Sequence, residues 1–467
     1  MSQDTVQRLA IDVHSLTGSD KAVYDWLTDH FGAPPVNFWR QMRWRTAWEA
    51  EMPVDGQVKP VLVRGSRGED YESFMTLHQE ADIHHVMERH GVPAPRVYGM
   101  IENPVAIVME KIRGGINSEL IEDPNQRQRV RREFIEALVK LHSIPPEAFG
   151  DVGFFVPRNS RDAAFNMYKG CIDIVRRKLT YPVGYVEFVA RWLERKAPAD
   201  RNRVGFVTGD AGQFMYDDEG LTGLIDFEVS YLGDPAAEFA GMRLRHSTEP
   251  LGEISELCDY YESLTGDRIS KKVIEYHSAG FAGTNSMLMW PLIFKPEPSH
   301  DLLAYLQFTI ATSRWGLSGI AEYEGVKLEV QPEPEESPIA FPSVAPHMEQ
   351  ALRAIDTDNA ELEYKLVGAA DNARYLDRVN RYGASILAAD IGDAKTLTGK
   401  TVATRLEADQ AVYDFVCMAG PESDVALVVH FHRWLSRQNF LLKGCGSQSY
   451  LTEYNLQYIP PRPADQA

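Results

Sequence analysis

The alternation of apolar and polar positions predicts a change from strands to helices along the chain. Residues 4–31 are expected to form two short helices, which end at Gly32-Ala-Pro-Pro. The segments NFWRQMRWRTAWEAEM and VKPVLVRGSRG, joined by a PVDGQ turn, are typical of antiparallel strands. A helix, YESFMTLHQEADIHHVMERHGVPAP, and a hairpin, RVYGMIENPVAIVMEKIRGG, are predicted to follow.

Helical periodicity dominates from residue 116 onward, with two interruptions. Residues 204–238 contain short apolar runs around a DDEG turn, which predicts small strands. Residues 330–346 are rich in Pro and Glu and lack periodicity, so we expect a linker there. Residues 347–467 are helical again, and a bundle of about four helices is the simplest packing for them.

Length and composition limit the kind of protein. A chain of 467 residues is too long for one ordinary core, so about two or three domains are expected. The net charge of −19 argues against a nucleic acid or an anionic membrane as a partner. The sequence shows no signal-peptide pattern, no apolar run long enough to span a bilayer, and no CxxC pair among its four cysteines. We therefore expect a cytoplasmic location.

Two aspartates in residues 204–238 carry the candidate chemistry. Asp210 follows the run VGFVTG, and Asp226 follows LTGLI, so a strand–turn–strand unit would bring both carboxylates to one end of a small sheet. An ionised carboxylate is costly to bury without a partner. The pair therefore suits a metal ion and a phosphate group better than it suits a hydrophobic core.

A cation and a glutamate in the preceding segments are expected to pair. Glu80 shares one face of the predicted helix with Ile83 and Met87, at positions i, i+3 and i+7. A glutamate on such a face needs a cationic partner, and Arg64 on the preceding strand is the nearest candidate by topology. A strand cation paired with a helix glutamate holds nucleotide phosphates in kinases. A surface position for Glu80 is the simpler alternative.

Two other motifs fail. Gly399-Lys400-Thr401 resembles the end of a phosphate-binding P-loop, but Ala394 stands where the motif requires glycine. His430 and His432 lie two positions apart on a predicted helix and would point apart, which argues against a metal site.

The order of these segments resembles a protein-kinase-like fold, with a small antiparallel β lobe, a hinge and a larger helical lobe. VTGDAGQFMYDDEGLTGLIDFEVSYLGDPAAEFA is similar to the His-Gly-Asp-(x)-Asn, Ile-Asp-(Trp/Phe)-Glu and Gly-Asp-Pro-(x)-Asp-Leu-Ala series of the aminoglycoside phosphotransferase and choline kinase family. VLVRG, QEADIHHVMERHGVPAPRVYG and AIVMEKIRGG match its strand, helix and hinge segments. The likeness is closest to the phosphotransferase-like domains found with acyl-CoA dehydrogenases, and it covers about residues 20–325.

The resemblance implies an α+β chain with four parts. These are an N-terminal lobe with leading helices at 1–113, a helical lobe with the catalytic and metal loops at 114–329, the linker at 330–346 and an all-α helical domain at 347–467.

The resemblance also implies a role for each matching residue. Asp210 would orient and deprotonate the attacking hydroxyl, and Asp226 would bind the Mg²⁺ that bridges the phosphates of ATP. Arg64 would take the position of the family's strand lysine, with Glu80 as its partner.

The nucleotide contacts are expected at the hinge and in an arginine-rich loop. Met109, Glu110 and Lys111 would contact adenine, mainly through the backbone. The nucleotide-binding loop, RQMRWRT, lacks the family's glycines, so Arg43 or Arg45 would replace their backbone contacts.

The sequence departs from the family at the catalytic loop. Thr208 stands in place of the histidine before Gly-Asp, and Met215 stands five residues after Asp210, where the family has a metal-binding asparagine. Methionine offers Mg²⁺ no oxygen. Deleting two loop residues in the comparison puts Gln213 in the asparagine's place, and its longer side chain could reach the same site.

These features predict an ATP- and Mg²⁺-dependent phosphotransferase that acts on a hydroxyl group of a small molecule. The alternative, favoured by Thr208 and Met215, is a catalytically silent kinase-like domain that binds nucleotide or a partner. A metal-dependent phosphate hydrolase is a third interpretation.

The acceptor stays open between a hydroxyacyl or other catabolic intermediate and an aminoglycoside-like compound. Arg243, Arg245 and His246 could meet an anionic acceptor, although charges on a helix surface are the simpler interpretation. Residues 347–467 could pack on the kinase lobe, close over the substrate or form a homodimer.

Overall fold

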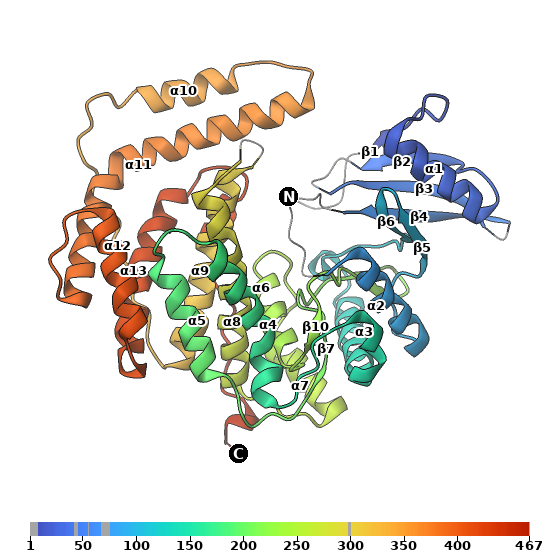
Figure 1. The fold of residues 1–467 in the computed structure, drawn as a ribbon, viewed down its shortest axis with the longest axis horizontal. Coiled ribbons are helices and arrows are strands. Elements are labelled where there is room, and N and C mark those ends of the chain that lie inside the picture. Colours follow the sequence, from blue (N-terminus) through green and yellow to red (C-terminus); the bar gives the residue numbers. More distant parts are fainter. Residues whose placement is uncertain (1–7, 42–44, 55, 67–74, 298–299, 467) are drawn as a thin grey trace. The chain divides into compact units, whose positions relative to one another are not determined.

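The computed structural model describes residues 8–41, 45–54, 56–66, 75–297 and 300–466. The chain divides into two compact units. Unit 1 comprises Met1–Arg158 and Asn202–Arg268, and unit 2 comprises Asn159–Arg201 and Ile269–Ala467 (Figure 1). Each unit thus contains part of the helical lobe that the sequence predicts at 114–329.

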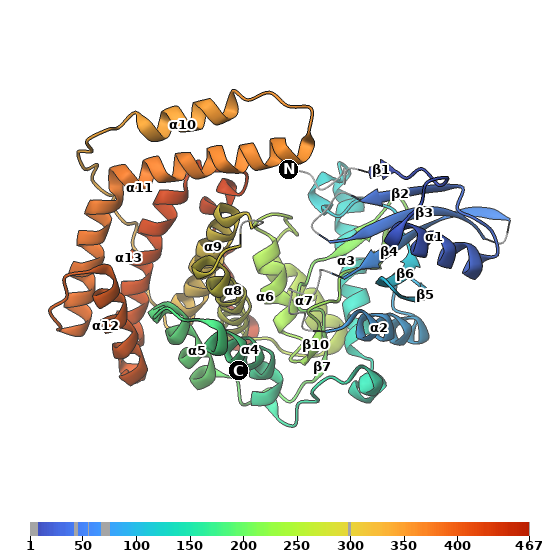
Figure 2. The ribbon, with the colours of Figure 1, turned by 45° about the horizontal axis from the view of Figure 1, so that its top comes forward.

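Unit 1 begins with a six-stranded antiparallel sheet in the order β1-β2-β3-β4-β6-β5 (Figure 2). Two helices, α1 (Gly18–Phe31) and α2 (Leu77–His90), belong to the same part of the chain. The strands are β1 (Arg8–Ala10), β2 (Asn37–Gln41), β3 (Ala47–Val54), β4 (Gln57–Gly65), β5 (Val97–Glu102) and β6 (Val105–Glu110).

Helices cover both faces of this sheet. Val108 of β6 packs in one hydrophobic cluster with Val23 of α1. Ile107, which precedes it, packs in a second cluster with Ala81 of α2. Successive side chains of a strand point to opposite faces, so the unbroken apolar run at 105–109 is what a strand buried on both faces requires.

Residues 4–31 contain one helix in their described part, and not the two expected. β1 pairs with β2, with Arg8 opposite Gln41, and α1 begins only at Gly18. A strand of three residues is too short for its alternation to be told from a helical turn. The prediction of leading helices is therefore wrong over residues 8–17, and residues 1–7 lie outside the described part.

The remainder of unit 1 carries two small antiparallel sheets among helices. β7 (Gly205–Val207) pairs with β10 (Tyr231–Gly233), and β8 (Phe214–Tyr216) pairs with β9 (Leu221–Leu224). Two backbone hydrogen bonds close the turn at Asp217–Gly220, which confirms the DDEG hairpin. The helices here are η1 (Ser118–Leu120), α3 (Pro124–His142), η2 (Pro146–Val152), α6 (Ala237–Arg245) and α7 (Ile254–Thr265).

Unit 2 is helical throughout its described residues, apart from its loops. Its α-helices are α4 (Ser160–Lys178), α5 (Gly184–Lys196), α8 (Lys271–Phe294), α9 (Leu302–Tyr323), α10 (Val344–Arg353), α11 (Ala360–Thr398), α12 (Arg405–Met418) and α13 (Asp424–Leu442). Its 3-10 turns are η3 (Pro421–Ser423), η4 (Ser449–Thr452) and η5 (Pro463–Gln466). None of the helices in the described parts of the chain is both long and apolar enough to cross a bilayer.

The helical C-terminal region is confirmed, and its largest hydrophobic cluster is shared with earlier helices of unit 2. Residues 326–339 contain no helix or strand, and α10 begins inside the predicted linker. Trp192 of α5 and Tyr276 of α8 share one hydrophobic cluster with Phe431 of α13. α12 packs against α5, and α13 packs against α9. The apolar face of α5 would otherwise be exposed to water.

Candidate active site

The β8–β9 hairpin brings Asp210 and Asp226 together, as the sequence predicts. Gln213 lies between them: its Nε2 donates to Asp210 Oδ2 at 2.6 Å and to Asp226 Oδ2 at 3.0 Å. The Gln213 carbonyl accepts a hydrogen bond from the Ile225 amide at 3.1 Å, which closes the loop before β8. One amide nitrogen therefore bonds to both Asp210 Oδ2 and Asp226 Oδ2, which holds the two carboxylates close together.

Gln213, and not Met215, occupies the loop position beside the aspartates. Met215 lies within β8, opposite Gly223, whereas Gln213 is the last residue before that strand. This geometry agrees with the comparison in which the loop is shortened and Gln213 replaces the family's asparagine. The role of Gln213 as a metal ligand stays a prediction.

Unusual backbone conformations fix both ends of the site. Gly209 has a φ of 78°, and a Cβ there would lie 2.2 Å from the carbonyl oxygen of Val229, so only glycine fits. Asp226 has a φ of 65° and is the only non-glycine residue with positive φ in the described parts of the chain. Sparsely populated conformations cluster at functional sites, where the surrounding structure holds a side chain in place.

Arg64, on β4, joins three carboxylates. Its Nη1 donates to Glu80 Oε1 of α2. Its Nη2 donates to Asp226 Oδ1 at 2.9 Å and to Glu228 Oε2 at 3.0 Å. The predicted pairing of Arg64 with Glu80 is confirmed, and Glu80 is only 1% exposed, so the surface alternative is wrong. Arg45 adds a second guanidinium, which pairs with Glu228.

This positive charge acts on Asp226. Burial raises the pKa of Asp226, but Arg64, Arg45 and the hydrogen bond from Gln213 outweigh burial and hold the pKa below its ordinary value. Asp226 is therefore ionised at neutral pH, as a metal ligand must be. Arg43, the alternative to Arg45, lies outside the described residues, so its role stays a prediction.

Arg245, at the end of α6, holds the other carboxylate. Its Nη2 donates to Asp210 Oδ2 and its Nη1 donates to Glu249 Oε2, both at 2.7 Å. Burial lowers the pKa of Arg245, but Asp210 and Glu249 outweigh burial and raise it above its ordinary value. Asp210 Oδ2 thus accepts bonds from Gln213 and Arg245, whereas Oδ1 has no hydrogen-bond partner among the described residues.

The interpretation of Arg243 and Arg245 as charges on a helix surface is wrong. Arg243 is fully buried, and Arg245 reaches the candidate base. His246, the third residue of this group, accepts a hydrogen bond at Nδ1 from the Leu251 amide at 3.3 Å, and burial lowers its pKa. The sequence alone could not distinguish these positions, because it does not say which side of α6 faces the catalytic loop. Contact with an anionic acceptor stays a prediction.

Thr208 and Glu238 form a buried pair behind the catalytic loop (residues 208–213). The Thr208 amide donates to Glu238 Oε1, and the Thr208 hydroxyl donates to Glu238 Oε2, both at 2.7 Å. Glu238 is 1% exposed, and His142 Nε2 lies 3.5 Å from its Oε1. Glu238 stands at the aspartate position of the Gly-Asp-Pro series, and sequence reasoning gave it no role. Thr208 and Glu238, which both differ from the family motif, are therefore hydrogen-bonded to each other.

The predicted hinge is part of the sheet. Glu110 donates its N–H to the Arg96 carbonyl at 2.7 Å, and Lys111 donates its N–H to the Pro60 carbonyl at 3.1 Å. The Met109 side chain is buried between the sheet and α2. Adenine recognition at these residues stays a prediction, and it would have to use their carbonyl groups or amides beyond residue 111.

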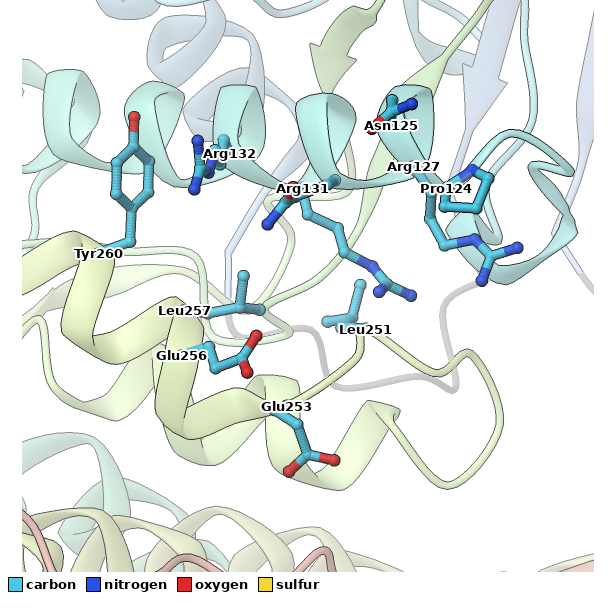
Figure 3. A pocket seen from close by; sticks show the side chains of 11 residues that line it. Pro124, Asn125, Arg127, Arg131, Arg132, Leu251, Glu253, Glu256, Leu257 and Tyr260 are labelled. Atoms are coloured by element: carbon cyan, nitrogen blue, oxygen red, sulfur yellow. The ribbon is translucent and has the colours of Figure 1, made fainter.

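A cavity of about 400 Å³ lies in unit 1 between α3 and α7 (Figure 3). Arg131 extends into it from α3, Glu256 lines it from the first turn of α7, and Glu253 lines it from the position just before that helix. No ion pair joins the two walls among the described residues. Leu251 borders the cavity and touches the catalytic loop, because a Cβ on Gly212 would lie 3.0 Å from Leu251 Cδ1. The Leu251 side chain thus lies between the cavity and the catalytic loop.

The oxygen atoms of the site suit Mg²⁺ that is bound together with a nucleotide. No group of three or more His, Cys, Asp or Glu side chains in the described residues could hold a metal ion by itself. Mg²⁺ usually takes one or two carboxylates and completes its shell with phosphate oxygens and water. The contacts above join five carboxylates to three guanidinium groups, so negative charge is in excess and a cation would offset it.

Residues 54–268 match the model of a family described as the phosphotransferase enzyme family. This segment, slightly less than half of the chain, is similar to that family, and the resemblance found in the sequence is confirmed. The protein is therefore an enzyme of the class that transfers a phosphoryl group to a hydroxyl acceptor. No curated protein matches the chain.

Solved structures that are similar to the chain include three phosphotransferases. A candidate aminoglycoside phosphotransferase from Ralstonia eutropha JMP134 superposes with a TM-score of 0.52 at 16% identity, over 66% of this chain and 98% of the other, and shows the kinase-like fold. The macrolide 2'-phosphotransferase MphH from Brachybacterium faecium has a TM-score of 0.44 at 15% identity, over 60% and 95% of the chains. A thermostable mutant of the aminoglycoside phosphotransferase APH(4)-Ia, in complex with ADP and hygromycin B, has a TM-score of 0.46 at 12% identity, over 64% and 97%.

Proposed function

We propose that the protein is an ATP-dependent kinase that phosphorylates a hydroxyl group of a small molecule, with Mg²⁺ bound together with the nucleotide. One observation carries this proposal: Gln213 bridges Asp210 and Asp226, while Arg64 joins Asp226 to Glu80. Phosphoryl transfer depends on positioning and charge neutralisation more than on covalent chemistry. This network supplies both.

Asp210 is the proposed base. Gln213 and Arg245 hold its Oδ2, so Oδ1 is the atom that accepts the proton of the acceptor hydroxyl. The oxygen that loses this proton forms a bond to the γ-phosphorus, and the bond between that phosphorus and the bridging oxygen of ADP breaks. Two donors on one carboxylate oxygen fix the plane of the base, which aligns the hydroxyl before transfer.

Arg64 is the proposed ligand of the nucleotide phosphates. Glu80 is buried and anchors one end of the guanidinium, while the other end faces Asp226 and Glu228. Binding of a phosphate there exchanges one anionic partner of Arg64 for another. The planar guanidinium suits this exchange, because its N–H groups match the spacing of carboxylate and phosphate oxygens alike.

Asp226 and Gln213 are the proposed protein ligands of Mg²⁺, which neutralises charge on the phosphates when it is bound. As the Gln213 amide is placed, its Nε2 faces both aspartates. Gln213 must therefore turn its amide over to present Oε1 to a cation, because an amide nitrogen carries no lone pair for a metal.

The acceptor is proposed to carry polar groups on both sides of its hydroxyl. Leu251 separates the cavity of Figure 3 from the catalytic loop, and the cavity walls carry Arg131 and Arg132 opposite Glu253 and Glu256. A polyol or a compound with both charges would match these walls, whereas an apolar compound would offer no polar group to Glu253 and Glu256. Hydroxylated catabolic intermediates and aminoglycoside-like compounds both remain in this class.

A panel of hydroxylated acceptors, tested by ADP release, examines the proposal. We expect at least one acceptor to stimulate ADP release, and Asp210→Asn to bind ATP–Mg²⁺ but to reduce turnover by about 10²–10⁴-fold. Asp218→Asn is the matched control, because Asp218 is exposed in the β8–β9 turn. Full turnover by Asp210→Asn would overturn the assignment of the base.

A further inference from the structure

Unit 2 contains a second cavity, of about 240 Å³, lined by residues of α5, α8, α12 and α13 and of the segment before α5. Its volume suits a ligand smaller than a typical drug molecule. Two of these helices, α12 and α13, follow the predicted linker, whereas α5 and α8 precede it. The proposed kinase chemistry does not use this cavity. Its lining combines aromatic rings with a few polar side chains, the usual composition of a small-molecule site.

The aromatic rings form a row of nearly parallel faces. The centroids of Tyr181 and Phe294 are 4.5 Å apart with 15° between the ring planes. Phe294 and Trp290 are 5.9 Å apart at 23°, and Trp290 and Trp434 are 6.0 Å apart at 28°. Rings in this arrangement can extend their stacking to a further planar molecule.

Polar groups lie on either side of Trp434. His430, Trp434 and Gln438 are spaced four residues apart on α13, so they share one face of the helix, and all three line the cavity. Neither the His430 imidazole nor the Gln438 amide has a hydrogen-bond partner in the parts of the chain that the structure describes. The indole N–H of Trp290 in the same wall is buried and also lacks an acceptor there.

The two histidines of α13 point apart, as the sequence predicts. His432 Nε2 lies 2.7 Å from the carbonyl oxygen of Glu329, whereas His430 lines the cavity. Burial lowers the pKa of His430 to about 4. Its imidazole is therefore neutral at pH 7 and offers one donor and one acceptor nitrogen.

The charged groups of the lining compensate one another. Arg405 pairs with Asp390 at 2.6 Å and lies 3.8 Å from Asp409. The Tyr181 hydroxyl donates to Asp409 at 2.6 Å. A charged ligand would have to break one of these pairs, so the cavity favours a neutral one.

We propose that this cavity binds a neutral, planar nitrogen heteroaromatic molecule of one or two rings, which stacks on Trp434 and exchanges hydrogen bonds with His430 and Gln438. The row of aromatic rings favours a planar ligand, and the paired charges favour a neutral one. His430 and Gln438 favour a ligand that carries hydrogen-bond donors and acceptors at its ring edge.

Titration of the full chain with benzimidazole tests this proposal, with calorimetry as the readout and ATP–Mg²⁺ present at saturation. We expect one molecule bound per chain. Gln438→Leu should weaken binding by about tenfold, the effect of one hydrogen bond, and Trp434→Leu should abolish it. Indole, which lacks the acceptor nitrogen, should bind more weakly than benzimidazole.

Gln410→Leu is the matched control. It makes the same change of residue type outside the cavity, at an exposed position of α12. Absence of saturable binding at millimolar benzimidazole would overturn the proposal. Unchanged binding in both Gln438→Leu and Trp434→Leu would overturn it too. Competition by ATP–Mg²⁺ would do the same, since it would assign the compound to the nucleotide site of unit 1.

Discussion

Replacement of Arg64 by methionine separates the structural role of this guanidinium from its proposed role in binding nucleotide. Arg64 lies between Glu80, Asp226 and Glu228, and the Glu80 side chain is only 2% exposed. Methionine leaves that glutamate charged and without this partner. Removal of one partner from a buried ion pair costs about 3–5 kcal/mol. We expect the free energy of unfolding of unit 1 to fall by about that amount.

The double variant Arg64→Met/Glu80→Met should recover most of this loss, because two apolar side chains can replace a buried ion pair without a net penalty. Nucleotide binding should not recover. A hydrogen bond to a charged group contributes about 1.5–3 kcal/mol, so the Kd for ATP–Mg²⁺ should rise about 10- to 150-fold in both variants.

Urea denaturation followed by circular dichroism and calorimetric titration with ATP–Mg²⁺ measure the two effects. Arg96→Met is the matched control: the Arg96 side chain is 65% exposed, so its loss should change stability by no more than about 0.5 kcal/mol. The reasoning is refuted if the double variant is as unstable as Arg64→Met, or if Arg64→Met binds ATP–Mg²⁺ with unchanged affinity.

Three further predictions follow from the site and its supports. Arg245→Met should lower kcat by about 10- to 150-fold with little change in the KM for ATP, because Asp210 loses a charge-assisted bond; an equal further loss in the Asp210→Asn background would contradict a role that acts through Asp210. Thr208→Val should lower the free energy of unfolding by about 1–3 kcal/mol, because buried Glu238 loses a donor, whereas Thr208→Ser should not; equal losses would contradict this. Burial lowers the pKa of His84 from 6.5 to about 4, so the unfolded chain takes up a proton first as the pH falls. Stability from this group is complete above pH 6.5 and is lost towards pH 4, by about 3 kcal/mol, and an unfolding profile against pH with the same slope in His84→Asn would contradict this.

The sequence predicted those elements whose pattern is local and complete. The apolar run of β6 and the buried face of α2 around Glu80 depend on periodicity within one segment. β1 was missed because its three residues become a strand only through pairing with β2. Packing of residues 347–467 on the kinase lobe was one of three open alternatives, because the apolar face of α12 shows that it packs but does not say that α5 is its partner.

The residues that stand in a motif were predicted, as was the pairing of Glu80 on α2, whereas the contacts made by α6 were missed. Asp210, Asp226 and Gln213 lie in one hairpin, so their proximity follows from the chain itself. Arg245 and Glu238 come from α6, and only the packing of that helix decides that they face the catalytic loop. Glu238 did carry a signal, since its position in the Gly-Asp-Pro series and the change at Thr208 depart from the family together.

Calorimetric titration of the full chain with ATP, with and without Mg²⁺, tests the central claim most directly. The account predicts that Mg²⁺ strengthens ATP binding to the native protein and to Asp210→Asn. In Asp226→Asn, this Mg²⁺ dependence should be lost, because the ionised ligand of the cation is gone. ATP binding that is absent at millimolar concentration, or that keeps its full Mg²⁺ dependence in Asp226→Asn, would contradict the account.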